Sequence, residues 1–241
     1  MLLKSLSLSG CEQINDFSFL QHNKNLTSLD LSKCIQINDF SFLKHFKFLT
    51  NLNLSLCSQI NGISFLKHLE NLTSLDLSDC TQINDFSFLK CCHLTSLNLS
   101  MCTQIDDFSF LQHSKNLKSL DLSWCREVND FSFLQNCRNL RSLNLSGCKQ
   151  INDFNFLQHH KHLTALTLLG CTQIKNFSFL EHCEGLTDLD ISWCTQINDI
   201  SFLEHCKFLT NLNLSMCDQI NDVNLQFFQE RRVKVISSNR I

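Results

Sequence analysis

The sequence contains no proline and no tyrosine, and only five of its 241 residues are glycine. With so few glycines there is no phosphate-cradling loop and no nucleophile elbow, and no catalytic constellation emerges. No window approaches the roughly 18 consecutive apolar residues of a membrane helix. The formal net charge is −3, and the basic residues form no block apart from the group Arg231, Arg232 and Lys234. We therefore expect a protein that is not an enzyme, does not span a membrane and does not bind nucleic acid.

Cysteine, in contrast, is abundant, with 15 residues. The first ten residues, MLLKSLSLSG, contain one lysine and alternate leucine with serine, so they do not read as a secretory signal. Without an export signal, reduced thiols inside the cell are the default. We expect a cytoplasmic protein or, if the source is an intracellular bacterium, a protein delivered to the host cytosol.

Ten of the cysteines mark an internal repeat, which reads L-x-x-L-x-L-S-x-C-x-Q-I-N-D-F-S-F-L-x-H-x-x-x. The interval between them is 23 residues, except that 22 residues separate Cys80 from Cys102. The ladder cysteines are Cys11, Cys34, Cys57, Cys80, Cys102, Cys125, Cys148, Cys171, Cys194 and Cys217. A single unit of this kind cannot bury its apolar face, so such repeats stack into a solenoid.

The repeats account for most of the chain. We predict ten repeats over residues 1–222 and a C-terminal cap over residues 223–241. Within the cap, the sequence predicts a short helix around Asn224–Arg232 and a closing strand at Val233–Ile236.

The motif L-x-x-L-x-L followed by Cys resembles the leucine-rich repeat family, specifically its cysteine-containing subclass, in which Cys replaces the usual ladder Asn. The segments INGISFL (Ile60–Leu66) and INDISFL (Ile197–Leu203) are similar to the short repeats of bacterial internalins, with Phe where those usually have Pro. The resemblance implies an α/β solenoid, a right-handed superhelix with a concave parallel sheet and short 3-10 or irregular convex segments.

The residues themselves agree with this architecture. In LTSLDLS, Leu75 and Leu77 alternate with polar residues, which predicts a short strand with one buried face. Asn84 and Asp85 are good N-cap residues for a single helical turn, and so short a return segment favours a 3-10 helix. Sixteen of the 21 phenylalanines fall in two columns of this segment, where we expect them to stack in the core.

Each ladder cysteine should follow a strand, where its S–H can donate to a neighbouring backbone carbonyl while the sulfur packs as an apolar atom. Neighbouring copies should lie about 4.8 Å apart with parallel side chains, whereas a disulfide needs Cβ atoms about 3.5–4.5 Å apart that face each other. We therefore expect reduced thiols with raised pKa values, which are poor nucleophiles. Cys92, Cys137, Cys183 and Cys206 belong to another column, which we expect to be half-buried.

We predict no metal and no cofactor. Zinc held by Cys91, Cys92 and His93 is an alternative, but the paired C-x-x-C spacing is missing. A convex histidine column could sense pH or collect metal, and we interpret it as a solvated row. Its members are His22, His45, His68, His113, His159, His182 and His205.

Two columns should face out from the sheet. The central column alternates Asp and Asn, which indicates either a polar ladder whose amides donate to the acids or an acidic stripe that recruits a basic protein segment. The column before each ladder cysteine is the least regular, and its Trp and Met residues are typical binding anchors, although scattered exposed apolar residues are also common. The predicted partner-binding residues are Trp124, Trp193, Met101, Met216, Leu56, Asp76, Asp121, Asp190, Arg141 and Asp188.

We expect a non-enzymatic scaffold that binds another protein through its concave face. The alternatives are a metal- or redox-responsive scaffold, a self-associating structural module, and a substrate-recognition adaptor. The last follows from resemblance to ubiquitin-ligase F-box subunits and to bacterial host-interaction proteins, although no F-box is present. Met1–Leu3 enter the first strand without a visible cap, so we also expect that self-association could use this end.

Overall fold

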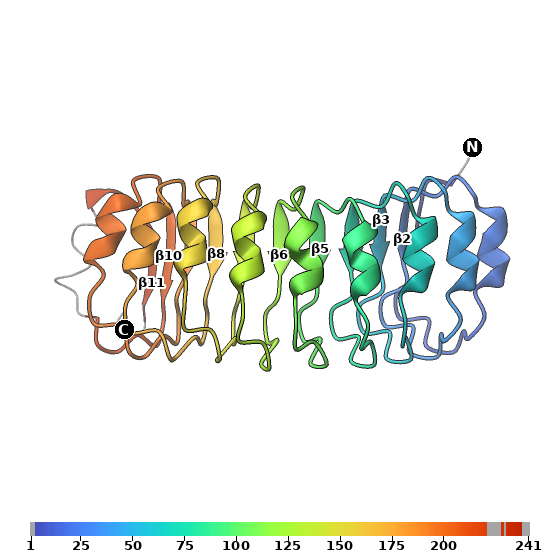
Figure 1. Ribbon diagram of the computed structural model, residues 1–241, viewed down its shortest axis with the longest axis horizontal. Helices are drawn as coiled ribbons and strands as arrows, with labels where there is room; N and C mark the ends of the chain where they lie inside the picture. Colours follow the sequence, from blue (N-terminus) through green and yellow to red (C-terminus); the bar gives the residue numbers. More distant parts are fainter. Residues whose placement is uncertain (1–2, 221–227, 229, 238–241) are drawn as a thin grey trace.

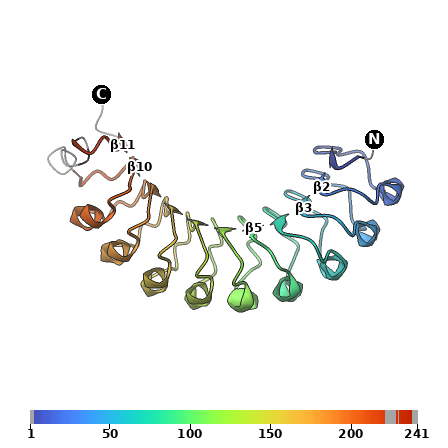
Figure 2. The same ribbon diagram turned by 90° about the horizontal axis from the view of Figure 1, so that it is seen from above.

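The protein is a curved stack of short strands. The computed structural model describes residues 3–220, 228 and 230–237. Within these residues, eleven strands lie parallel in one open sheet and follow the order of the sequence from β1 to β11. Strands line the inner side of an arc and short helices cover its outer side (Figure 1 and Figure 2). This is the predicted solenoid with a concave parallel sheet and 3-10 helices on the convex side.

The repeated elements are nearly uniform. The strands are β1 (Ser5–Ser7), β2 (Ser28–Asp30), β3 (Asn51–Asn53), β4 (Ser74–Asp76), β5 (Ser96–Asn98), β6 (Ser119–Asp121), β7 (Ser142–Asn144), β8 (Ala165–Thr167), β9 (Asp188–Asp190), β10 (Asn211–Leu214) and β11 (Lys234–Ser237). The 3-10 helices are η1 (Ser18–His22), η2 (Ser41–His45), η3 (Ser64–His68), η4 (Ser87–Cys91), η5 (Ser109–His113), η6 (Ser132–Asn136), η7 (Asn155–His159), η8 (Ser178–His182) and η9 (Ser201–His205).

Leucine alternation sets the sheet. Leu75 in the middle of β4 is buried, and it lies in register with Leu52 of β3 and Leu97 of β5. Because side chains alternate across a strand, the first and third residues of each strand face the concave surface. The shortened repeat keeps this register, since Ser74 pairs with Ser96. The missing residue is absorbed in the loop between η4 and β5, as predicted.

The two phenylalanine columns form a spine between the sheet and the convex helices, interrupted where Ile63 and Ile200 replace phenylalanine in the first column. A ring from the first column of one repeat packs on a ring from the second column of the next repeat. Phe154 and Phe179 have ring centroids 4.5 Å apart and planes 10° apart. The predicted stacking of phenylalanine in the core is confirmed, with Phe19 of the first repeat as an exception, since it is 52% exposed.

Aspartate initiates the convex helices, although not from the predicted position. The carboxylate of Asp130 accepts the backbone N–H of Ser132 at 2.8 Å, and this bond lowers the pKa of Asp130 because it favours the charged form. The N-cap residue of η6 is Phe131, so the aspartate lies one residue earlier, in an Asx turn that leads into the helix. Asp16 and Asp199 make the same bond.

The C-terminal region is described only in part. Strand β11 pairs with β10 and confirms the predicted closing strand, displaced by one residue. Phe228 is buried against the core. The predicted helix at 224–232 falls largely outside the described residues, and the boundary between residues 222 and 223 lies wholly outside them, so both stay predictions. In the described part of the chain, no helix has the length and apolar character needed to cross a membrane.

Candidate functional site

The ladder cysteines form a line of buried hydrogen-bond donors behind the sheet. The Cys57 Sγ atom donates to the carbonyl oxygen of Leu31 at 3.2 Å, and the Cys148 Sγ atom donates to that of Leu122 at 3.2 Å. The same bond is made by Cys34, Cys80, Cys102, Cys125, Cys171, Cys194 and Cys217. Burial raises the pKa of Cys57 and of Cys148 to about 12. The predicted S–H donor role is therefore confirmed, and these thiols are unsuited to nucleophilic chemistry.

The second cysteine column is deeper than predicted. Cys137, Cys183 and Cys206 are fully buried rather than half-buried, because the chain turns inward immediately after each 3-10 helix, whereas Cys92 in the shortened repeat is half-buried as predicted. His160 occupies the same column and is also buried, and its Nδ1 atom lies 2.9 Å from the carbonyl oxygen of Phe156. Burial lowers the pKa of His160, because the charged imidazolium is poorly solvated there. This column is part of the core.

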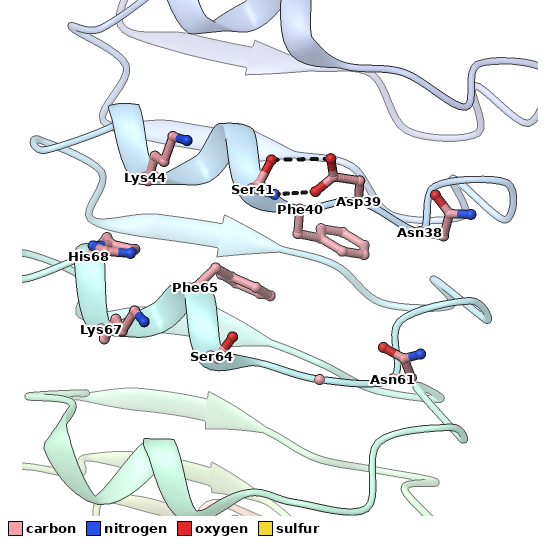
Figure 3. Close-up of a pocket in the computed structure, with 11 residues that line it drawn as sticks. Asn38, Asp39, Phe40, Ser41, Lys44, Asn61, Ser64, Phe65, Lys67 and His68 are labelled. Carbon is pink, nitrogen blue, oxygen red and sulfur yellow. Dashed lines mark hydrogen bonds between the residues drawn. The ribbon is translucent and has the colours of Figure 1, made fainter.

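The convex surface has shallow hollows between neighbouring 3-10 helices. Figure 3 shows one such hollow, which has a volume of about 260 Å³. The rings of Phe40 and Phe65 stack there, with their centroids 5.5 Å apart. Asp39 accepts hydrogen bonds there from the backbone N–H and the hydroxyl of Ser41. Similar hollows recur between later repeats, so they are seams of the stack. Among the residues that the structure describes, no group of three or more His, Cys, Asp or Glu side chains is placed to hold a metal ion.

The central concave column is a hydrogen-bonded polar ladder. The Nδ2 atom of Asn98 donates to Asp76 at 3.1 Å, and that of Asn144 donates to Asp121 at 2.9 Å. The other carboxylate oxygen of Asp121 accepts the backbone N–H of the turn that follows the strand, at 2.8 Å. The predicted donation from amides to acids is therefore confirmed, and the aspartates hold fixed orientations on the concave surface.

The irregular column before each ladder cysteine has one backbone conformation throughout. All ten positions have φ between 58° and 73°, which is the left-handed region. Three are glycines, namely Gly10, Gly147 and Gly170, and the other seven are Lys33, Leu56, Asp79, Met101, Trp124, Trp193 and Met216. A left-handed L-residue costs roughly 1–2 kcal/mol, and β-branched residues, for which this conformation is a true outlier, are absent from the column. The residue type varies in this column because the side chains project outward at a turn, where packing in the core does not constrain them.

The structure separates the two tryptophans that the sequence grouped together. Trp193 is 51% exposed. Trp124 is half-buried because its indole lies on Gly147, so closely that a Cβ atom at residue 147 would come within 2.5 Å of the ring. The guanidinium of Arg126 covers the Trp124 ring, 5.1 Å from its centroid. Trp193 is therefore the more available contact residue.

The predicted binding residues fall into three groups along the solenoid. The N-terminal third carries Leu56 and Asp76, and the middle carries Met101, Trp124, Asp121 and Arg141. The C-terminal third carries Trp193, Met216, Asp188 and Asp190. Met101, Met216 and Leu56 are 46%, 41% and 38% exposed. All of them lie on or beside the strands, but they do not form a single patch.

One hollow of about 300 Å³ opens on the concave face of the C-terminal third, between β8 and β11. Asp188 and Asp190 line it, together with residues that the sequence reading missed, which are Ala165, Thr167, Lys234 and Ile236. A signal was present in the sequence, since ALT in β8 departs from the SLD or SLN of β2 and of β4 to β7. Lys234 and Ile236 belong to the predicted closing strand, but the sequence gave no register for it against β10, because it lies beyond the last repeat.

The fold and the concave face together define a leucine-rich repeat solenoid. The family described as Zer-1-like, leucine-rich repeats matches residues 63–132 and 131–215, which is more than half of the chain. The chain belongs to this family. A second family, described as leucine rich repeat, matches residues 22–39.

Solved structures of internalins share the fold. The internalin InlF from Listeria monocytogenes matches with a TM-score of 0.69 and 22% identity, over 89% of this chain and 74% of that one. Internalin C2 from the same organism matches with a TM-score of 0.66 and 27% identity, over 77% and 79%. The functional domain of InlJ, also from Listeria monocytogenes, is described as including a cysteine ladder. It matches with a TM-score of 0.52 and 18% identity, over 82% of this chain and 50% of that one. No curated protein sequence matches the chain at a significant level.

Proposed function

We propose that this protein is a non-enzymatic scaffold that binds another protein through its concave face. The partner lies on the polar ladder and contacts the apolar residues of the left-handed column at the rim. A cytoplasmic location suits this function, because the many buried thiols would remain reduced there.

The observation that carries the proposal is the set of large residues at left-handed positions. Glycine is free of strain at such a position, and three repeats use it. Leu56, Met101, Trp193 and Met216 keep exposed apolar side chains there although each conformation costs roughly 1 kcal/mol. Stability alone does not favour them. Exposed Trp and Met side chains on a defined rim are typical of protein-binding surfaces.

The test compares two pairs of substitutions in quantitative affinity purification from lysate. Trp193→Ala with Met216→Ala removes rim side chains, and we expect the captured partner to be lost. Phe48→Ala with Phe208→Ala is the matched control, because these residues are 57% and 67% exposed and lie in the loops that enter β3 and β10, away from the rim. Trp124→Ala should also weaken binding, with little change in folding. A partner that binds every variant as tightly as the wild type would refute the proposal.

Self-association is a second candidate, favoured by one observation. Phe19 is 52% exposed, whereas Phe42 at the same position of the next repeat is 5% exposed. Within the described residues, β1 pairs on one side only, with β2. Light scattering over a range of concentrations tests this function. A mass that stays monomeric at every concentration, for both the wild type and Phe19→Ser, would contradict it. An adaptor role, as in a ubiquitin ligase or a host-interaction protein, would use the concave face in the same way.

A further inference from the structure

The hollow at the C-terminal end of the concave face has a charge pattern that is unique among the described strands. Strand β9 carries aspartate at both outward positions, Asp188 and Asp190, whereas the other strands carry at most one acid. Alternate residues of a strand lie about 6.6 Å apart and point to the same face. Both carboxylates therefore line the same hollow of about 300 Å³.

Neutral donors hold these two carboxylates in place. Asp188 accepts a hydrogen bond from the Nδ2 atom of Asn211 at 2.6 Å and another from the hydroxyl of Thr187 at 2.6 Å. Asp190 accepts one from the Nδ2 atom of Asn213 at 2.9 Å, and its other oxygen accepts the backbone N–H and the hydroxyl of Ser192 at 2.9 Å and 2.6 Å. Within the part of the chain that the structure describes, neither carboxylate pairs with a lysine or an arginine. Two oriented negative charges thus face the hollow, and Lys234 is the one basic residue described in its lining.

The rest of the lining includes small and apolar residues, and Lys234 at its edge is its one basic residue among those described. Ala165 lines it from β8, and Ile236, which is 49% exposed, lines it from β11. Trp193 stands at the adjacent rim, three residues after Asp190. This combination suits a side chain with an aliphatic stem and a charged end, and lysine and arginine have this form.

Two basic residues limit where a cation can bind. Arg141 immediately precedes β7 and Lys234 begins β11, so each lies two strands from β9. Two strand spacings are about 9.6 Å, slightly beyond the Debye length of about 8 Å at physiological ionic strength. Their repulsion is therefore weakened by screening at β9, and it is stronger at β8 and β10, which lie only one strand spacing from a basic residue. The favourable position is confined to Asp188 and Asp190.

We propose that this hollow takes a lysine or arginine side chain from an extended segment of the partner protein. The stem lies against Ala165 and Ile236, and the charged group lies between Asp188 and Asp190. This inference rests on the proposed concave-face function and specifies the chemistry of what is bound at one place on that face.

The experiment uses the whole chain and three capped pentapeptides, Ser-Leu-Arg-Leu-Ser and its analogues with Gln or Glu in the centre. The readouts are the NMR signals of the Trp193 indole N–H and of the Asn211 and Asn213 side-chain amides. We expect the Arg peptide to shift these signals with a dissociation constant of about 1 mM or tighter, and the Gln peptide to bind about tenfold more weakly. The Glu peptide should leave the signals unchanged.

Charge removal on the protein provides the second arm. Asp188→Asn with Asp190→Asn should reduce binding of the Arg peptide to the level of the Gln peptide. Glu127→Gln with Glu204→Gln is the matched control, because it removes two exposed negative charges that lie outside the concave strands, and it should leave binding unchanged. The peptide series on the wild type needs no variant to fold.

Three results would overturn the inference. They are equal binding of the Arg and Gln peptides, unchanged binding to the Asp188/Asp190 variant, and the absence of any shift with the Arg peptide at several millimolar, a few times the expected dissociation constant. Equal binding of the two peptides at these signals would leave the concave-face function standing. If the concave-face function itself is wrong, a natural partner should bind the Trp193/Met216 variant as tightly as the wild type.

Discussion

Raising the pH from about 8 to about 10 should unfold this solenoid, because its buried thiols cannot ionise in the folded state. A ladder cysteine donates its S–H to a carbonyl, as Cys148 does to Leu122. The thiolate has no proton to donate and would face that carbonyl oxygen in a dry core. Burial accordingly raises the pKa of the Cys148 thiol from 9.0 to about 12.

The sign follows from the difference between folded and unfolded chains. Below pH 9 both states keep their thiols protonated, so the stabilisation is complete. Between pH 9 and pH 12 the unfolded chain ionises while the folded chain does not, and the free energy of unfolding falls. At pH 10 one thiol with these two pKa values lowers it by about 1.4 kcal/mol.

Several thiols contribute together. Burial raises the pKa to about 12 for Cys57, Cys102, Cys137, Cys148, Cys171 and Cys183. These six residues lower the free energy of unfolding by about 8 kcal/mol at pH 10. Domains of ordinary stability have about 5–15 kcal/mol in total, so unfolding should be complete or nearly so at this pH.

Two signals report the transition. Thiolate formation raises the ultraviolet absorbance, and the chain contains no tyrosine whose ionisation would overlap with it. Circular dichroism reports the loss of structure, and the two curves should coincide. The matched variant Cys148→Ala with Cys171→Ala should lower the pH dependence of the free energy of unfolding near pH 10 by about 2.5 kcal/mol per pH unit. Thiols that ionise near pH 9 while the circular dichroism stays native would refute the reasoning.

Three further predictions concern packing and backbone strain. Phe154→Ala should destabilise the protein by about 3–5 kcal/mol in urea unfolding, because its ring is buried in the stack. Phe19→Ala should cost under about 1 kcal/mol, because its ring packs on Phe17 but is 52% exposed, and equal losses would contradict the phenylalanine spine. Gly147→Ala should lower the melting temperature through its φ of +68° and its clash with the Trp124 indole, and Trp124→Ala should restore only the part due to the clash; full restoration would show that strain at 147 is negligible. Met101→Gly should keep or raise stability by up to about 1 kcal/mol, because it removes a left-handed L-residue, and a marked loss of stability would show that the methionine packs on the fold.

The fold was predictable because it is repeated. Each leucine of the motif recurs in ten repeats, so a pattern that is ambiguous in one repeat is settled by the same position in the others. The rings that stack at Phe154 and Phe179 and the amide that reaches Asp121 from Asn144 both follow from columns visible in the sequence. Stacking at fixed register converts sequence columns directly into neighbours in space.

The candidate site was predictable only in part, because it depends on departures from the repeat. The sequence identified the irregular column, and its three glycines are compatible with positive φ, but the Trp, Met and Leu residues at the other positions argued against it. It also could not show that the Trp124 indole lies on Gly147, one repeat away. The hollow between β8 and β11 needs the closing strand, whose register with β10 no motif encodes.

The contrast between the uniform stacking residues and the variable left-handed column also bears on the proposed binding surface. The residues that stack the repeats are nearly invariant from copy to copy, so differences gather where stacking makes no demand. Neutral change would favour glycine or small polar residues at a left-handed turn, because these relieve the strain at no cost to the core. Large apolar side chains at four exposed positions, Leu56, Met101, Trp193 and Met216, run against that preference. Their presence is the physical reason for proposing this rim, and not the convex surface, as the binding surface.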